Sequence, residues 1–519
     1  MEENKLKQTD SNAEIQDTAT ALSTNVNAVR AVARAVEGTI GPKGLDTMLV
    51  DNYGDVIVTN DGVTILEKME VNHPAAKMLI NIAKAQQEAV GDGTTTATIM
   101  AGSMVSEGLF QVIKGVPVAR VIEGIKYSLE QALLFIKNSA IKIELLDDEN
   151  LYNIAMVSGR EHSDIAKLVV EAAKLIGREK LCDNNFKLAE TIIAKESADN
   201  EVFMGVVVTK ERMSKEMPDS IENVGILLID DALEPEEMTS EALRTDAGFQ
   251  RYLLLQEEFK NNIHKIIDTG VKLILVDRGV NEVAEEMLTD AGVMVLRRVE
   301  HAEMEKVAEH IGARMIKRNG LKKSLEELTR YIGFAQKVYE DNKLEQVRIL
   351  GGKGRPMATV LVGAATQEVV GERARIAKDA ASSVQATVKE GYIAGGGALE
   401  IATAQKIEGL RENIGGMSAY GVDCVVNALK RPLTQIINNA GYNPLEKLEE
   451  VIATQKKLNN TNLAIDCNTG NVADMLSLGV IDPMLVKYHA VKAAGEVAIA
   501  ILRIDTIIRK KDESNIEEN

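Results

Sequence analysis

The stretch Val90-Gly91-Asp92-Gly93-Thr94-Thr95-Thr96 carries the strongest local signal in this sequence. A helical pattern precedes it, and an apolar, helix-like segment follows over residues 97–112. Two glycines let the backbone approach a bulky anion, and the free N–H groups of the next helix favour phosphate at its N-terminus. The aspartate would repel bare phosphate, so its presence makes sense if Mg²⁺ bridges the two. A helix C-cap, a turn and a threonine N-cap explain the same letters without a ligand, so both interpretations stay open.

Three other segments carry residue types that suit phosphate chemistry, and each also has an ordinary structural explanation. Residues 39–44, Thr-Ile-Gly-Pro-Lys-Gly, offer backbone amides and one lysine, although a Gly-Pro stop after a helix is common. Residues 58–64, Val-Thr-Asn-Asp-Gly-Val-Thr, predict a strand–turn–strand hairpin in which Asn-Asp-Gly is ordinary turn chemistry. Asp379 lies in a helical pattern over residues 373–388, before the glycine run at residues 395–397. That run favours close packing against a flat or charged ligand.

Acidic residues near glycine turns fit a magnesium-nucleotide hydrolase in which carboxylates orient water. The sequence contains no GxxxxGK[ST] motif, which excludes the P-loop class. Cys182, Cys424 and Cys467 are far apart and form no CxxC pair, and the six histidines show no HxxxH spacing. We therefore expect neither a disulfide framework nor a zinc site, and any bound metal should be a hard cation on oxygen ligands.

Composition limits the class of protein further. The 519 residues include 60 basic and 78 acidic side chains, for a formal net charge of −18, and 45% are hydrophobic. An acidic chain is a poor partner for nucleic acid, because phosphate binding needs an excess of Lys and Arg. No stretch reaches about 18 uninterrupted apolar residues, so we expect no membrane span. The first twenty residues lack the apolar core of a signal peptide, and we expect a cytoplasmic protein.

The outer thirds of the chain differ from its middle. Both outer thirds are alanine-rich with helical periodicity, as over residues 74–90 and 487–508. In the middle, short apolar runs such as 224–229 and 273–276 predict buried strands, followed by amphipathic helices such as 281–290. The alternation predicts a compact α/β module at about residues 205–350, inserted into a mostly helical body.

One connection within the middle module is unusually long. Residues 231–272 separate two predicted strands and contain the acidic stretch LEPEEMTSEAL and then an amphipathic helix. The apolar side chains of that helix are Phe249, Leu253, Phe259, Ile263 and Ile266. Two interpretations fit this pattern. One is an ordinary crossover helix with a long surface loop, and the other is a projecting arm that acts as a cover.

The order of these motifs resembles the chaperonins. GPKG, TNDGVT, GDGTTTAT, the KDA that contains Asp379 and AGGG follow one another as in that family, and the resemblance extends from about residue 25 to 509. VNHPAAKMLI, GVVVTKERMSKEMP and ILRIDTII are similar to group II, thermosome-type chaperonins. VGAAT, VKEGYIAGGG and GVIDP resemble the bacterial group I form. The mixture resembles the bacterial lineage of group II-like chaperonins called group III.

The resemblance implies a multidomain chaperonin fold in a double-ring ATPase that encloses unfolded polypeptide. A mostly helical equatorial domain that binds ATP would take residues 1–140 and 398–519. A small intermediate domain would take residues 141–204 and 355–397. An α/β apical domain that binds substrate would take residues 205–354, with a helical protrusion at about 231–260 as a built-in lid. A separate cochaperonin lid should then be unnecessary.

The resemblance also implies roles for individual residues, with ATP and Mg²⁺ as ligands and K⁺ as a further cation that the family allows. Asp92 would bind Mg²⁺, Asp61 and Asp379 would position and activate the attacking water, and Asp482 would bind the ribose hydroxyls. Because Asp379 falls in the intermediate domain, the site would be complete only when that domain closes. The expected nucleotide-binding residues are Thr39, Ile40, Gly41, Pro42, Asn60, Gly91, Asp92, Gly93, Thr94, Thr95, Thr96, Ser158, Gly159, Arg160, Gly395, Gly396, Asp466, Cys467, Asn468 and Asp482.

Two segments depart from the family pattern. Ser158-Gly159-Arg160 stands where group II members carry a Gly-Lys pair that senses phosphate, which makes Arg160 a candidate substitute. Asp466-Cys467-Asn468 occupies the adenine-side stretch where asparagine is usual at the first position, so this chain has a carboxylate there in place of an amide. The Gly-Gly-Met tail of group I is absent.

The leading hypothesis is therefore an ATP-driven folding chaperone that acts as a homo-oligomeric double ring. The alternative is a ring-forming holdase or scaffold that binds ATP but hydrolyses it little. The three acidic residues Asp61, Asp92 and Asp379 argue against it, because a scaffold has no need of Asp379. A small-molecule kinase on this fold would need a substrate pocket that no motif suggests.

Overall fold

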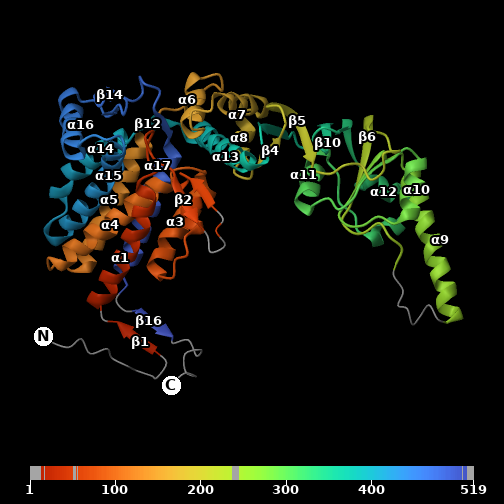
Figure 1. Cartoon of the computed structure of the whole chain (residues 1–519), viewed down its shortest axis with the longest axis horizontal. Helices are drawn as coiled ribbons and strands as arrows, with labels where there is room; N and C mark the ends of the chain where they lie inside the picture. Colours follow the sequence, from red (N-terminus) through yellow and green to blue (C-terminus); the bar gives the residue numbers. More distant parts are fainter. Residues whose placement is uncertain are drawn as a thin grey trace. The chain divides into compact units, whose positions relative to one another are not determined.

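The computed structural model describes residues 13–16, 18–50, 54, 56–236, 245–504 and 507–510 (Figure 1). The chain divides into two compact units. The first is built from Met1–Val170, Leu181–Phe186 and Lys378–Asn519, and the second from Glu171–Lys180 and Lys187–Ala377. In the sequence, the second unit is thus inserted into the first. The finer boundaries at residues 140, 204, 354 and 397 stay a prediction.

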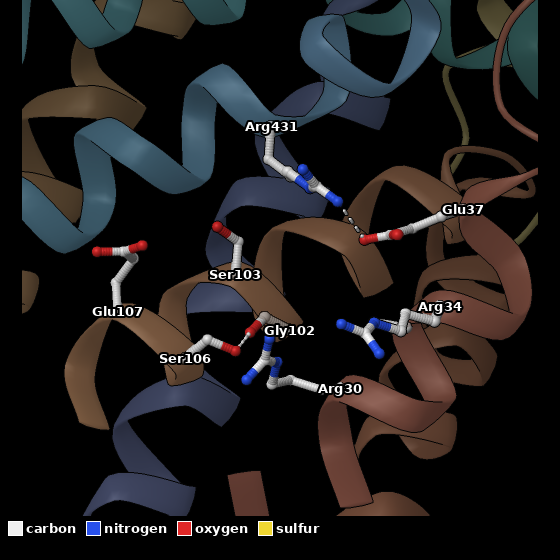
Figure 2. A pocket seen from close by; sticks show the side chains of 9 residues that line it. Arg30, Arg34, Glu37, Gly102, Ser103, Ser106, Glu107 and Arg431 are labelled. Atoms are coloured by element: carbon white, nitrogen blue, oxygen red, sulfur yellow. Dashed lines mark hydrogen bonds and ion pairs between the residues drawn. The ribbon is translucent and has the colours of Figure 1, made fainter. Parts of the chain in front are cut away.

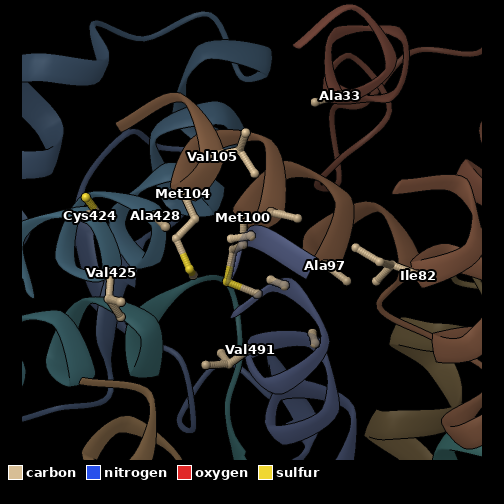
Figure 3. Packing of buried hydrophobic residues seen from close by; sticks show 14 of the residues in the cluster. Ala33, Ile82, Ala97, Met100, Met104, Val105, Cys424, Val425, Ala428 and Val491 are labelled. Carbon is tan, nitrogen blue, oxygen red and sulfur yellow. The ribbon is translucent and has the colours of Figure 1, made fainter. Parts of the chain in front are cut away.

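The first unit is a bundle of long helices. Its principal helices are α1 (Thr18–Glu37), α3 (Pro74–Val90), α4 (Thr94–Ile113), α5 (Val118–Asn138), α14 (Ala398–Gly409), α15 (Ala419–Asn439) and α17 (Met484–Leu502). Helix α4 is apolar on nearly every side, and a helix of that kind is stable only when other helices surround it. It accordingly packs against α1, α3, α15 and α17. Figure 3 shows Met100 and Met104 of α4 beside Val425 of α15 and Val491 of α17.

Short elements complete the first unit. They are α2 (Gly62–Lys68), α6 (Glu149–Ser158), α16 (Pro444–Leu458) and four antiparallel strand pairs. The described pairs are β1 (Ala13–Gln16) with β16 (Ile507–Lys510), β2 (Thr47–Val50) with β3 (Val56–Thr59), β12 (Tyr392–Ala394) with β15 (Ile481–Pro483) and β13 (Leu463–Ile465) with β14 (Val472–Asp474). Three helices carry the chain between the units: α7 (Ser163–Ile176), α8 (Arg178–Leu181) and α13 (Gln367–Glu390).

The second unit is built on a mixed sheet. Its strands are β4 (Ile192–Glu196), β5 (Glu201–Val208), β6 (Ser220–Ile229), β7 (Leu273–Val276), β8 (Met294–Leu296), β9 (Gly333–Asp341), β10 (Gln346–Gly352) and β11 (Ala358–Ala364). Across the described residues their order is β4-β11-β5-β10-β9-β6-β7-β8. Strands β6, β7 and β8 are parallel, and β5, β10, β9 and β6 pair antiparallel.

Helices cover both faces of the parallel part of this sheet. They are α9 (Asp246–Asp268), α10 (Glu282–Asp290) and α11 (His301–Ile311). Ile226 and Leu228 of β6 pack in one core cluster with Met304 of α11, while Leu227 packs in the other cluster with Ile263 of α9. Both faces of β7 and of the last four residues of β6, Ile226 to Ile229, are therefore buried, which explains why these segments are apolar at every position. The predicted strands at 224–229 and 273–276 and the helix at 281–290 are confirmed.

Helix α9 has two different halves. Phe259 and Ile263 in its C-terminal half are buried against the sheet, whereas Phe249, Leu253 and Leu254 in its N-terminal half are 51%, 45% and 58% exposed. The N-terminal half extends past the sheet of this unit (Figure 1). Of the expected lid at about residues 231–260, residues 237–244 lie outside the described part of the chain. None of the described helices is both long and apolar enough to span a bilayer.

Candidate functional site

The stretch at residues 90–96 forms a tight loop between helices α3 and α4. Gly91 and Gly93 adopt left-handed conformations, with φ of 72° and 77°. A Cβ added at Gly91 would lie 2.3 Å from the Ser382 hydroxyl oxygen, and one at Gly93 would lie 2.6 Å from Cγ1 of Val486. Both positions therefore require glycine for conformation and for space. Gly93 caps α4 without a side chain, which leaves the first N–H groups of α4 open to an anion.

The half-buried Asp92 carboxylate is held by three hydrogen-bond donors. Its Oδ1 accepts a hydrogen bond from Gly93 N at 2.5 Å. Its Oδ2 accepts from the hydroxyls of Ser158 and Ser383 at 3.4 and 3.3 Å. Burial raises the pKa of the Asp92 carboxyl, and the negative charge of Asp482 raises that pKa further. A carboxylate in this position gains from a nearby cation.

A second charged group lies beside Asp92. Asp482 is on β15, and Nζ of Lys487 on α17 is 3.1 Å from its Oδ2 and 2.7 Å from Oε1 of Glu400 on α14. Burial lowers the pKa of Lys487, but the charges of Asp482 and Glu400 outweigh it and hold that pKa above its ordinary value. Gly395 lets β12 pass close to this group, since a Cβ there would lie 2.9 Å from Asp482 Oδ2. Gly396 turns the chain at φ 61°.

Asp61 is the N-cap of helix α2. Its Oδ2 accepts hydrogen bonds from Thr64 N at 2.9 Å and from the Thr64 hydroxyl at 2.7 Å. The predicted hairpin at 58–64 is therefore wrong: β3 ends at Thr59, a helix follows, and β3 pairs instead with β2. A Cβ on Gly62 would lie 2.4 Å from the Thr95 hydroxyl, which puts the start of α2 against the start of α4.

Asp379 reaches the same loop from helix α13. Nε2 of Gln87, in the last turn of α3, donates to Asp379 Oδ1 at 3.3 Å. One helical turn later, Ser382 packs on Gly91 and Ser383 donates to Asp92. Residues 379, 382 and 383 share one helical face, and that face covers the glycine loop. Sequence reasoning identified Asp379 but missed Gln87 and the two serines.

The loop at residues 39–42 follows the end of α1. The Thr39 hydroxyl donates to Val36 O at 2.9 Å, and Gly41 turns the chain at φ 87°. Asn439, at the end of α15, donates from Nδ2 to the carbonyl oxygens of Glu37 and Ile40, both at 2.9 Å. Asn439 thus fixes this loop, and no sequence pattern pointed to it.

The segment at residues 466–468 forms a self-contained turn. Asp466 accepts from Asn468 N at 2.9 Å and from the Thr469 hydroxyl at 2.8 Å, so its carboxylate holds its own loop. These hydrogen bonds lower the pKa of Asp466, and the charge of Lys43 contributes to the same shift. Burial raises the pKa of the neighbouring Cys467 thiol. The charge of Lys43 acts on both side chains, which links this turn to the 39–44 loop.

The Ser158-Gly159-Arg160 segment ends helix α6. Arg160 and Glu161 both have positive φ, 50° and 62°, a conformation that is uncommon outside glycine. Of the three predicted residues, Ser158 is joined to Asp92 by its hydroxyl. Gly159 lies close to α13, since an added Cβ would be 3.6 Å from Cβ of Ala380.

The donor set at this loop fits a cation that is bound together with phosphate. Two buried acceptors, Asn60 Oδ1 and Gln86 Oε1, have no hydrogen-bond donor within the described residues. The Gln86 amide nitrogen meanwhile donates to Asp92 O and Val486 O at 2.8 and 3.1 Å. No group of three His, Cys, Asp or Glu side chains in the described chain could hold a metal by itself. Mg²⁺ is usually held by one or two carboxylates together with water and phosphate oxygens, and the single carboxylate of Asp92 fits that kind of site.

Known proteins share both this sequence and this fold. The model of the TCP-1/cpn60 chaperonin family matches residues 32–512. The thermosome subunit of Pyrococcus abyssi is 36% identical over 505 residues, which cover 93% of this chain and 90% of the relative. The thermosome subunit beta of Sulfurisphaera tokodaii is 36% identical over 521 residues, 95% of this chain and 92% of the relative.

Among solved structures, a crystal structure of a group III chaperonin in the open state is 44% identical and superposes with a TM-score of 0.89. The match covers 95% of this chain and 99% of that chain. The predicted chaperonin fold, with a helical part and a mixed α/β part, is confirmed, as is the resemblance to thermosome-type and group III proteins. This chain belongs to the TCP-1/cpn60 chaperonin family.

Proposed function

We propose that the protein is an ATP-dependent chaperonin, in which hydrolysis at the glycine loop drives the enclosure and folding of unfolded polypeptide. One observation carries the proposal. Three acidic residues that are distant in sequence, Asp61, Asp92 and Asp379, converge on the loop between α3 and α4. A phosphate site alone needs the glycines and the helix N-terminus, whereas hydrolysis also needs carboxylates that can orient water.

Each part of the site has a role in this proposal. The backbone at residues 91–93 and the first N–H groups of α4 bind the phosphates, with the threonine hydroxyls at residues 94–96 as further donors. Asp92 holds Mg²⁺, which supplies neutralising charge at the phosphates. Asp61 and Asp379 orient the attacking water, and their carboxylates are the available proton acceptors. The Asp482 carboxylate accepts hydrogen bonds from the ribose hydroxyls, and Lys487 Nζ, 3.1 Å away, holds that carboxylate in place.

The remaining expected contacts belong to the same proposal. The loop at residues 39–42, fixed by Asn439, lines the nucleotide together with Gly395 and Gly396. The turn at residues 466–468 lies on the adenine side, with Asp466 serving to shape the turn. K⁺ is a further candidate cation. Its proposed ligand is Asn60 Oδ1, a buried oxygen that has no hydrogen-bond donor among the described residues.

The assembly and its lid are also proposed. We infer a homo-oligomeric double ring in the cytoplasm, with unfolded polypeptides as substrates. The N-terminal half of α9 exposes Phe249, Leu253 and Leu254, which suits an arm that covers the cavity and makes a separate cochaperonin lid unnecessary. The holdase alternative, with ATP bound but little turnover, is disfavoured because Asp379 is held over the phosphate loop.

Hydrolysis and binding can be separated by the substitution Asp379→Asn. The variant keeps the size of the side chain and its hydrogen bond with Gln87, so nucleotide binding should stay within about twofold of wild type. Turnover should fall by about 10²-fold or more, because general-base and water-positioning groups contribute at that level. Binding is measured by titration with ADP and turnover by phosphate release. Asp268→Asn, at an exposed aspartate of the second unit, is the matched control. Wild-type hydrolysis in Asp379→Asn would contradict the proposed role.

A further inference from the structure

A polar cavity lies among helices α1, α4 and α15, apart from the glycine loop (Figure 2). Its volume is about 240 Å³. Arg30 and Arg34 of α1, Ser103 and Ser106 of α4 and Arg431 of α15 are among its lining residues. Helices α1 and α4 approach closely at one wall, where a Cβ on Gly102 would lie 2.7 Å from that of Ala33.

The charges in this cavity are not balanced. Arg431 is paired, since its Nη2 lies 3.0 Å from Oε1 of Glu37. Glu107 accepts a hydrogen bond from Asn427 Nδ2 at 3.3 Å. Arg30 and Arg34 have neither an ion pair nor a hydrogen bond to any described residue, although Figure 2 shows both directed toward the cavity. Two like charges at positions i and i+4 of a helix repel each other and destabilise it. Arg30 and Arg34 are both exposed, and the lining holds three arginines against two glutamates, so a net charge of +1 at the cavity favours an anionic ligand.

We propose that this cavity binds a small anion with two or more negative charges, of the pyrophosphate class. Guanidinium groups present planar pairs of donors that match phosphate and carboxylate oxygens, and such charge-assisted hydrogen bonds are strong. The hydroxyl of Ser103 adds a neutral donor at the α4 wall. The volume of about 240 Å³ is below that of typical sites for drug-sized ligands, which favours a compact anion over a nucleotide.

The walls of the cavity continue into the proposed nucleotide site. Helix α1 ends at Glu37, whose carbonyl oxygen and that of Ile40 are both held by Asn439 of α15. Helix α4 begins at Thr94 of the glycine loop. An anion that draws Arg431 away from Glu37 would change the support of the loop at residues 39–42. This consequence rests on the proposed function: anion and nucleotide should change each other's affinity by the same factor.

Binding is tested on the assembled full-length protein by titration calorimetry with inorganic pyrophosphate in magnesium-free buffer. The test variant is Arg30→Gln/Arg34→Gln. The matched control is Lys126→Gln/Lys137→Gln, which removes two exposed positive charges from α5 in the same unit. The wild type and the control should bind one pyrophosphate per chain that the test variant loses or binds at least about tenfold more weakly. Pyrophosphate bound at the glycine loop would persist in all three proteins.

Several results would overturn the proposal. One is equal stoichiometry and affinity in the test variant and the control. Another is wild-type protein that binds no pyrophosphate beyond the glycine loop. If wild-type protein shows no such binding and the test variant sediments as smaller particles, the arginines instead contact an acidic side chain of a neighbouring copy. Arg34→Lys, which keeps the charge but loses the planar donors, should weaken binding less than the double substitution and serves if the latter fails to fold. None of these measurements depends on ATP hydrolysis. The anion-site proposal can therefore fail while the proposed function holds, and the reverse.

Discussion

Lys487 is a cation enclosed between two carboxylates where α14, α17 and β15 meet. Its side chain is 12% exposed and that of Glu400 is 2% exposed. Removing charges from water carries a large desolvation penalty, which an ion pair offsets only when its geometry is good. With Asp92 nearby, three carboxyl groups surround this one lysine. A bound cation would add positive charge to this group.

The substitution Lys487→Met should destabilise the protein by about 3–5 kcal/mol, because it leaves two enclosed carboxylates without their partner. Adding Glu400→Gln should recover part of the loss, since one stranded charge is removed. The measurement is the midpoint of urea unfolding, analysed as a double-mutant cycle. Lys126→Met, at an exposed position of α5, should stay within about 0.5 kcal/mol of wild type. A Lys487→Met variant as stable as that control would show that the ion group contributes nothing to stability.

The sequence identified the residues of the site that stand in motifs and missed those that support them. Gly91 and Asp92 were recognisable because glycines flank an acidic residue before a helical pattern. Lys487 and Glu400 gave only a weak signal, a single charge in otherwise apolar stretches. Their pairing spans more than eighty residues, and no local rule connects them. No sequence pattern pointed to Asn439 either, because its hydrogen-bond partners are carbonyl oxygens of a distant loop.

At the scale of elements, hydrophobic pattern located the buried strands but assigned the wrong type to the segment after Asp61. Strands β6 and β7 are apolar at every position of their parallel segment because α9 and α11 cover opposite faces of the sheet. The hairpin expected at residues 58–64 failed because Asn-Asp-Gly serves equally as a hairpin turn and as a helix start. Asp61 caps α2 through Thr64, and the choice depends on α4 packing against Gly62. No local sequence pattern predicts that contact between Gly62 and α4.

Helix α11 is joined to strand β10 by a buried histidine. His310 is 2% exposed, its Nε2 accepts from Gly352 N at 3.1 Å, and Nδ1 lies 3.4 Å from Arg355 O. The acceptor role of Nε2 assigns the proton of the neutral ring to Nδ1. Burial lowers the pKa of His310, while its contact with Arg355 O acts in the opposite direction. Protonation of Nε2 would remove the acceptor for Gly352 N and place a charge in the core.

Stability of the second unit should therefore fall on acidification. Because the folded-state pKa of His310 is lowered, its contribution is fully present above about pH 6.5, the ordinary value for histidine, and is lost as pH falls through the folded-state pKa. The measurement is the thermal unfolding midpoint between about pH 5 and 8. His310→Gln retains an acceptor but not the titration, so its midpoint should vary less with pH over this range. An unchanged pH dependence in the variant would show that other groups, such as His489, whose pKa burial also lowers, account for it.

At the scale of the whole molecule, the insertion of one unit into the other explains why distant segments form one site. The first unit takes both ends of the chain, so Asp92 lies beside Asp482 without a long loop. Helix α13 crosses from the second unit to the first between Ala377 and Lys378, immediately before Asp379. The residue proposed to position water thus lies where a continuous helix enters the unit that holds the glycine loop. Any displacement of that helix would reach Asp379 directly, so the proposed nucleotide site would respond to movement of the helix that enters from the second unit.

The assembly provides the broadest test of the proposal, because a single chain of 56.4 kDa cannot enclose another protein. We expect light scattering and negative-stain microscopy to show a two-tiered ring, and sixteen copies would weigh about 902 kDa. Mg-ATP should close the ring and protect it from protease, because the exposed apolar half of α9 would then be covered by its neighbours. Deleting residues 236–250 should abolish this protection but leave ATP hydrolysis within about twofold of wild type, since none of the residues proposed to bind nucleotide lies in the deleted segment. A deletion variant that still resists protease would contradict the lid role. A wild-type protein that is a monomer with and without Mg-ATP would contradict the folding chamber and favour the holdase.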